Sequence, residues 1–117
     1  MSMPILSLCL ALFNLSSSWQ PLFQEDNLEI KYKMESCESS DYIFFSITNH
    51  SDAEIQANFE LLVKGEDGQT LFTFHHWNFD LSPGTVSNEC GNINDNQLAV
   101  LLPQRYDNAS VHLIQKP

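Results

Sequence analysis

Hydrophobic and polar residues alternate along much of this chain with the two-residue period of a β-strand. The alternation is clearest in residues 28–35 and 55–64, where every second side chain is apolar. Residues 42–47 are apolar at nearly every position, which predicts a central strand covered on both faces. Shorter segments predict further strands at 70–74, 77–79, 85–90, 98–102 and 111–114. No segment has the period of an amphipathic helix.

Turn residues separate these segments. Residues 65–68 contain the two glycines that suit a tight hairpin turn, and residues 82–84 combine a proline with a glycine. Residues 91–96 are rich in Asn, which favours a loop. Seven or eight short strands separated by such turns are typical of a β-sandwich. We therefore expect an all-β fold, an immunoglobulin-like antiparallel β-sandwich.

The first eighteen residues have the features of a secretory signal peptide. An apolar stretch at residues 4–13 is too short to span a bilayer, and three serines at 16–18 suit cleavage before Trp19. No Lys or Arg precedes the apolar stretch, so the alternative is an N-terminal strand or short helix packed on the core. We expect a cleaved signal peptide at 1–18 and one sandwich domain at 19–117, which leaves 99 of the 117 residues.

The cysteines indicate the compartment. Cys9 lies in the predicted leader, so its removal leaves Cys37 and Cys90 as an even pair in an exported domain. Such pairs usually form a disulfide; the alternative is two unbonded buried thiols. The bridge would close a loop of about 54 residues and stabilise the domain by about 4 kcal/mol. We expect a disulfide-bonded protein that is periplasmic or secreted.

The charge of the chain excludes some partners. Fifteen acidic and five basic residues give a net charge of −10, and none of them lies in the leader. Such a surface repels phosphate backbones and anionic lipid headgroups. We therefore expect no nucleic-acid partner, and no membrane insertion after leader cleavage.

Some short stretches carry a family resemblance. Residues 47–55, residues 79–84 and the Glu89-Cys90 step resemble small secreted immunoglobulin-like domains of Bacteroidetes-type bacteria, over residues 27–102. The resemblance implies a sandwich fold and export, and no particular reaction. The chain departs from some similar sequences because it has no second cysteine pair near residues 65–73. It also lacks the Trp that follows the first cysteine in antibody-type domains, since Trp77 comes too late.

Candidate metal ligands are sparse. His75 and His76 are neighbours in a predicted strand, so their side chains should point to opposite faces and not chelate one metal. Asn92, Asn94 and Asp95 offer the oxygen ligands that calcium prefers, but without the acid spacing of a known calcium loop. We expect an Asn-rich turn here, and no cofactor.

Two functional hypotheses follow. The first is an exported, non-catalytic module that binds a protein or a glycan through its end loops or an exposed strand edge. His76 and Trp77, which we expect to be exposed, and Arg105 and Tyr106 are the candidate contact residues, because Trp, Tyr and Arg dominate binding hot spots. The alternative for these residues is ordinary core packing for Trp77 and ordinary loop chemistry for the others. The second hypothesis is a small calcium-dependent module or a hydrolase that uses strand-end and loop carboxylates. No serine lies in a nucleophile elbow, so we expect no enzyme.

Overall fold

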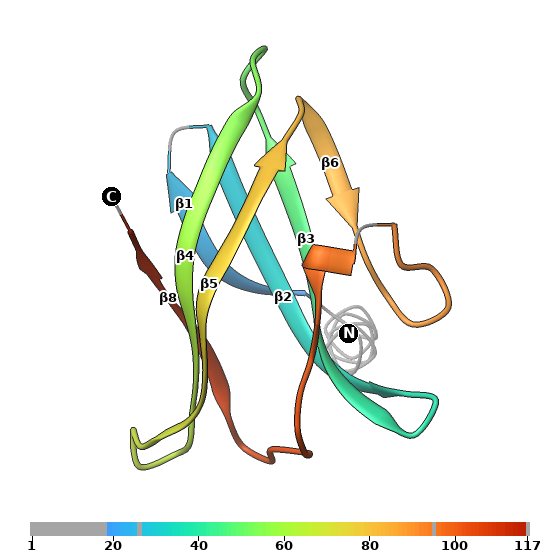
Figure 1. The fold of residues 1–117 in the computed structure, drawn as a ribbon, viewed down its shortest axis with the longest axis vertical. Coiled ribbons are helices and arrows are strands. Elements are labelled where there is room, and N and C mark those ends of the chain that lie inside the picture. Colours follow the sequence, from blue (N-terminus) through green and yellow to red (C-terminus); the bar gives the residue numbers. More distant parts are fainter. Residues whose placement is uncertain (1–18, 26, 95, 117) are drawn as a thin grey trace, which may run out of the picture.

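The protein is a two-layer β-sandwich (Figure 1). The computed structural model describes residues 19–25, 27–94 and 96–116. Eight strands and one turn of 3-10 helix make up the regular secondary structure of this part of the chain. They are β1 (Gln20–Glu25), β2 (Leu28–Cys37), β3 (Ser40–Asn49), β4 (Ile55–Lys64), β5 (Thr70–Leu81), β6 (Gly84–Ser87), the 3-10 turn η1 (Asn96–Leu98), β7 (Ala99–Leu101) and β8 (Ser110–Gln115). The expected all-β antiparallel sandwich is confirmed.

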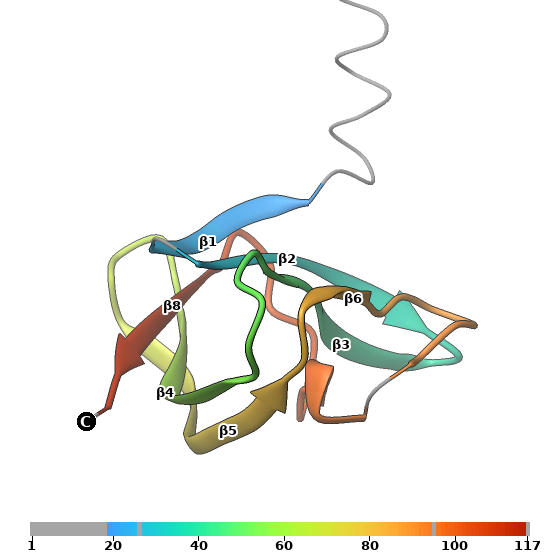
Figure 2. The same ribbon diagram turned by 90° about the horizontal axis from the view of Figure 1, so that it is seen from above.

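The strands form two antiparallel sheets. Sheet A has the order β1-β2-β3, and sheet B has the order β5-β4-β8. The second edge of β3 is shared, because β6 pairs with residues 46–49 and β7 pairs with residues 42–44. Figure 2 shows the two layers from above, with β1 and β2 in one and β4 and β5 in the other. The prediction that residues 42–47 form a central strand is confirmed.

The hydrophobic core fills the space between the sheets. Alternate residues of β2 and β3 point inward from sheet A, and alternate residues of β4 and β5 point inward from sheet B. The side chains with almost no exposed surface in this core are Ile30, Ile43, Phe45, Ile47, Phe59, Leu61, Val63, Trp77 and Leu98. Phe44 points to the opposite face of sheet A, yet it is also fully buried and stacks on Tyr42 with 5.2 Å between ring centroids.

Strand β5 corrects the prediction of two short strands at 70–74 and 77–79. A single twelve-residue strand runs through both segments. Its register with β4 shifts between the pairs Phe59↔Trp77 and Leu61↔Phe74, so that two residues of β5 lie opposite one residue of β4. This is a β-bulge, and it places both His75 and His76 opposite Glu60.

Other strands also differ from the sequence prediction. Strand β1 was not predicted, because Pro21 and a register shift at 21–23 remove its two-residue period. Strand β6 ends at Ser87 and not at residue 90, and an isolated bridge between Glu89 and Asn92 follows. The strand predicted at 98–102 begins one residue later, because Leu98 belongs to η1.

The predicted disulfide between Cys37 and Cys90 is confirmed, with Cα atoms 5.5 Å apart. It does not cross the core. Cys37 lies on the same face of β2 as Lys33 and Glu35, which is the outer face of sheet A, because Ile30 and Met34 face the core. The bond therefore attaches the segment after β6 to the outside of sheet A, unlike the inter-sheet disulfide of antibody domains.

No helix in the part of the chain that the structure describes is long and apolar enough to cross a membrane. The predicted signal peptide at 1–18 lies outside the described residues and stays a prediction.

Candidate binding groove

An apolar groove of about 520 Å³ lies where the edges of the two sheets face each other, between β5 of sheet B and β7 of sheet A. Its lining combines three aromatic side chains of β5 with the apolar residues of β7 and the polar end of η1. The lining residues are Phe72, Thr73, Phe74, His76, Trp77, Asn78, Gln97, Ala99, Val100 and Leu101. Although the chain is rich in acids, none of these ten residues carries a carboxylate or a permanent positive charge.

The groove is bounded by two unpaired strand edges. Strand β5 pairs with β4 alone and β7 pairs with β3 alone. Among the described residues, no backbone–backbone hydrogen bond other than those of the β4 ladder reaches β5. Unpaired N–H and C=O groups along such an edge are available to another strand.

Side chains bond to backbone carbonyls of β5 near its two ends and also at its centre, where Lys116 Nζ donates to the His75 carbonyl at 2.6 Å. At the hairpin end, the Tyr106 hydroxyl donates to the Leu71 carbonyl at 3.4 Å. At the opposite end, Asn49 is 2% exposed and its Nδ2 donates to the Leu81 carbonyl at 2.9 Å. The stretch from residue 72 to residue 80 lies between these two contacts, and most of the groove runs along it.

Large apolar side chains are exposed around the groove. Phe74 is 37% exposed, Leu101 is 58% exposed, and Leu71 at the hairpin end is 39% exposed. These are three of the five large exposed hydrophobic residues in the described chain. Isolated exposed hydrophobic residues are common, but a group that borders a concave surface favours an interaction site.

Trp77 forms the floor of the groove, and its predicted exposure is wrong. The side chain is 1% exposed and packs on Phe45 and Phe79, with centroid separations of 4.2 and 4.9 Å. Its Nε1 donates to the Gln97 carbonyl at 2.7 Å. Before the bulge, the even-numbered residues of β5 face the core, and after it the odd-numbered residues do. Trp77 follows the bulge and is therefore buried. It therefore supports the wall of the groove at η1 and offers a ligand little surface.

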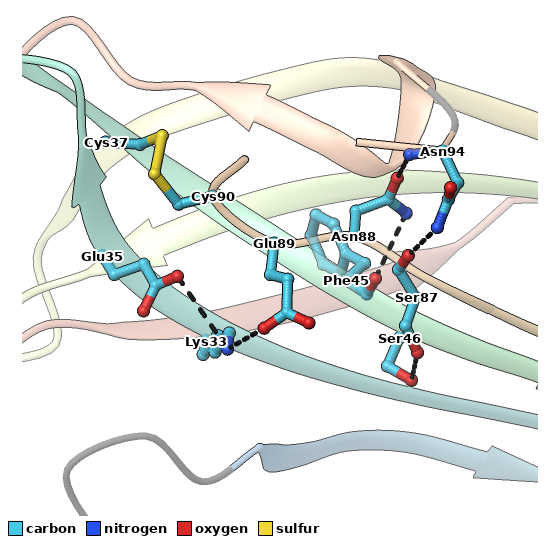
Figure 3. A network of polar contacts seen from close by, with 10 residues as sticks. All are labelled: Lys33, Glu35, Cys37, Phe45, Ser46, Ser87, Asn88, Glu89, Cys90 and Asn94. Atoms are coloured by element: carbon cyan, nitrogen blue, oxygen red, sulfur yellow. Dashed lines mark hydrogen bonds and ion pairs between the residues drawn. A yellow bond between two sulfur atoms is a disulfide. The ribbon is translucent and has the colours of Figure 1, made fainter. Parts of the chain in front are cut away.

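The segment that leads from β6 to the η1 wall is attached to sheet A by a polar network (Figure 3). Asn88 has no exposed surface. Its Oδ1 accepts from the Asn94 backbone N–H at 2.7 Å, and its Nδ2 donates to the Phe45 carbonyl at 3.4 Å. The Asn94 amide in turn donates to the Ser87 carbonyl at 2.7 Å. These bonds give the loop before β7 a defined conformation although it has little regular secondary structure.

Charged groups and the disulfide hold the same segment from its other side. Lys33 Nζ lies 3.4 Å from Glu89 and 3.9 Å from Glu35, and its side chain is only 11% exposed. The Trp19 ring covers this ammonium, with 4.6 Å between Nζ and the ring centroid. Cys90 follows directly and is bonded to Cys37. Covalent and ionic contacts thus anchor the segment that precedes η1 to sheet A.

The β-bulge changes the expected placement of the two adjacent histidines. Both rings are exposed, with centroids 6.5 Å apart. The His75 Nδ1 lies 2.8 Å from Glu60 Oε2, and Lys116 Nζ donates to the His75 carbonyl and lies 3.3 Å from His76 Nδ1. The premise that the two side chains lie on opposite faces fails here, because a bulge interrupts the alternation.

The other two predicted contact residues lie apart from most of the groove. Arg105 is exposed, and its Nε donates to Asp107 at 3.2 Å. Tyr106 packs against the core and meets β5 only through the contact with Leu71. The structure therefore brings His76 and Trp77 to the groove and Tyr106 to its hairpin end, but it does not bring Arg105 to the lining.

The loop considered for calcium binding includes Asn92 and Asn94, and both of these residues hold the loop in its conformation. Asn94 uses its amide to hold the loop, and the Asn92 backbone bridges to Glu89. Asp95 lies outside the described residues. No group of three His, Cys, Asp or Glu side chains suited to a metal ion occurs among residues 19–25, 27–94 and 96–116.

Comparisons with protein-family models, curated proteins and solved structures found no match to this chain. The resemblance to bacterial immunoglobulin-like domains stays a prediction, and the function is argued from the geometry of the groove.

Proposed function

We propose that this protein is an exported, non-catalytic binding module whose ligand occupies the groove between β5 and β7. One observation carries the proposal: an apolar groove of about 520 Å³ lies between two unpaired strand edges and is bordered by the exposed side chains of Phe74 and Leu101. Concave apolar surfaces with a few polar groups are the usual form of ligand sites. The polar groups here are Thr73, His76, Asn78 and Gln97.

The anchored segment before η1 also supports a binding role. A site binds best when its walls need no ordering in the complex, because the entropy of ordering weakens the affinity. The segment before β7 is held by the disulfide, the Asn88 network and the Lys33 ion pairs. The segment that leads into one side of the groove is therefore preorganised.

The export part of the proposal rests on the disulfide, because such bonds persist in oxidising compartments. The intact mass of the protein recovered from an exporting host tests it. We expect a mass for residues 19–117 that rises by about two hydrogens on reduction. A full-length mass with free thiols would contradict export.

Binding in the groove is tested with two ligand collections, a displayed library of random peptides and a glycan array. We expect ligands that bind the wild-type domain and lose at least about tenfold in affinity when Leu101→Arg places a charge at the groove. Ile114→Arg is the matched control, since Ile114 is 49% exposed on β8 of sheet B, away from the groove. Ligands that bind both variants equally would show that the groove is not the site.

A further inference from the structure

We propose that the ligand in the groove is an extended segment of another polypeptide, which adds a strand to β5 and carries Lys or Arg at both of its ends. This inference rests on the proposed function of the groove and names its occupant. Strand addition supplies affinity through backbone hydrogen bonds and specificity through every second side chain.

The backbone of β5 sets the length of this segment. Tyr106 contacts the Leu71 carbonyl and Asn49 contacts the Leu81 carbonyl, so residues 72–80 lie between these contacts, with the His75 carbonyl inside the stretch taken by Lys116 Nζ. Nine residues of strand span about 30 Å, which matches an extended ligand of about seven to nine residues. Because both ends of the edge are closed by side chains, a longer strand cannot pair along the whole of β5.

The lining of the groove determines which residue types we expect at the centre of the ligand. An added strand would direct alternate side chains between the sheets, where Phe74 and Val100 line the groove, while Leu101 lies at its rim, paired with Tyr42. These positions favour apolar ligand residues at every second place. The extra residue of β5 at 75–76 interrupts a regular ladder, so an added strand would pair in a different register on each side of the bulge. A ligand strand therefore cannot shift along β5 by two residues and keep the same pairing.

The charged residues outside the lining determine which residue types we expect at the two ends of the ligand. Exposed acids lie beyond residues 72–80 at the hairpin end, Glu66 and Asp67, and Asp80 lies at the other end. Of the nearby bases, Arg105 is paired with Asp107, Lys116 lies against His75 and His76, and Lys64 lies at the base of the hairpin, where the two acids outnumber it. A ligand with an uncharged centre and basic ends therefore complements this surface.

Charge also argues against a second copy of this chain as the occupant. Each copy carries a net charge of −10, so the edges of two copies would approach against their mutual repulsion. A basic segment from a different protein is attracted by the same field.

The experiment selects peptides of about twelve residues from a random displayed library on the wild-type domain and removes those that still bind Leu101→Arg. We expect the remaining peptides to alternate apolar and polar residues and to carry Lys or Arg at both ends. N-methylation of single backbone amides should lower the affinity at least about tenfold at alternate positions and leave the positions between them nearly unchanged.

Charge variants test the ends of the ligand. Glu66→Gln with Asp80→Asn should weaken binding of the selected peptides several-fold, and about 500 mM NaCl should do the same. Glu25→Gln with Glu38→Gln removes as many charges from β1 and the β2–β3 turn, so it is the matched control and should change the affinity much less.

The remaining outcomes separate this inference from the proposed function. Groove-dependent peptides that tolerate N-methylation at every position, or that lack basic ends, would overturn the inference and leave the groove as a binding site. The same conclusion would follow if only glycans bound in the groove. A dimer that Leu101→Arg dissociates would overturn it in favour of a second copy. Absence of any groove-dependent ligand would overturn both proposals.

Discussion

Two residues with left-handed backbone conformation form the turn between β2 and β3. Glu38 has φ 51° and Ser39 has φ 72°, and the flanking Cys37 and Ser40 are paired across the hairpin. Two-residue hairpins with positive φ at both positions favour Asn followed by Gly, because other side chains are strained there. This turn contains neither residue, so its strain must be balanced by the pairing of the strands and by the adjacent disulfide.

Replacement of this turn by Glu38→Asn with Ser39→Gly should raise the free energy of unfolding by about 1 kcal/mol, because it relieves the strain. Urea denaturation measures the change as a higher midpoint with an unchanged slope. Gly68→Ala is the opposite control. Gly68 has φ 83° with open space around it, so a methyl group there should only strain the backbone and lower the stability. A neutral turn replacement would contradict the prediction.

Asn88 is the second residue whose side chain determines local structure. Asn88→Ala removes an acceptor from the Asn94 N–H and a donor from the Phe45 carbonyl inside the protein. We expect a loss of about 1–3 kcal/mol in the free energy of unfolding, because the Asn94 N–H loses its acceptor, while the Phe45 carbonyl keeps the Asn88 backbone N–H. Asn92→Ala changes an exposed side chain in the same loop and should have little effect. Equal losses in the two variants would show that the Asn88 network is unimportant.

At the level of the strand, the apolar positions of β5 change from even-numbered to odd-numbered residues at the bulge. They are even-numbered at Phe72 and Phe74 and odd-numbered at Trp77, Phe79 and Leu81. Such a change of parity can mean two strands or one strand with an extra residue, and the sequence alone does not distinguish them. The pairing with an uninterrupted β4 decides for one strand. The change of parity alone marks residues 75–76 as the point where either a bulge or a strand break must occur.

This explanation predicts which residue of β5 the fold can lose. Deletion of His76 makes the apolar positions uniform in parity, so β5 should pair regularly with β4 and the stability should fall by only about 1 kcal/mol. Deletion of Asn78 instead changes the relative faces of Trp77 and Phe79 and should cost several kcal/mol or prevent folding. Thermal unfolding compares the two variants. Similar melting temperatures would contradict this account of the bulge.

At the level of the whole molecule, strand periodicity predicts elements better than it predicts partners. The alternation in β2, β4 and the apolar run in β3 identify these strands because their core faces are continuous. The sharing of one β3 edge by β6 and β7 comes from contacts distant in sequence, which no local pattern records. The groove depends on that arrangement. Of the residues that line the groove, the sequence therefore singles out His76 and Trp77 and gives no signal for Phe74 or Leu101.

The disulfide should contribute a large part of the overall stability. It joins residues 53 apart, and the chain-entropy model gives about 4 kcal/mol for a loop of this size. Cys37→Ala with Cys90→Ala should therefore lower the free energy of unfolding by about that amount in denaturant titrations. Dithiothreitol should destabilise the wild-type protein similarly and leave the double variant unchanged. A change below about 1 kcal/mol would show that the bond adds little.

The position of this disulfide has a consequence for biogenesis. Cys37 lies on the outer face of sheet A, and Cys90 is exposed in a connecting segment. Oxidation therefore does not have to precede collapse of the core, as it would for sulfurs enclosed between two sheets. An oxidoreductase can approach Cys90 on a chain whose sheets have already assembled, and the native neighbours of Cys37 then select the correct partner. Covalent closure can thus be the last step of maturation, acting on a folded substrate.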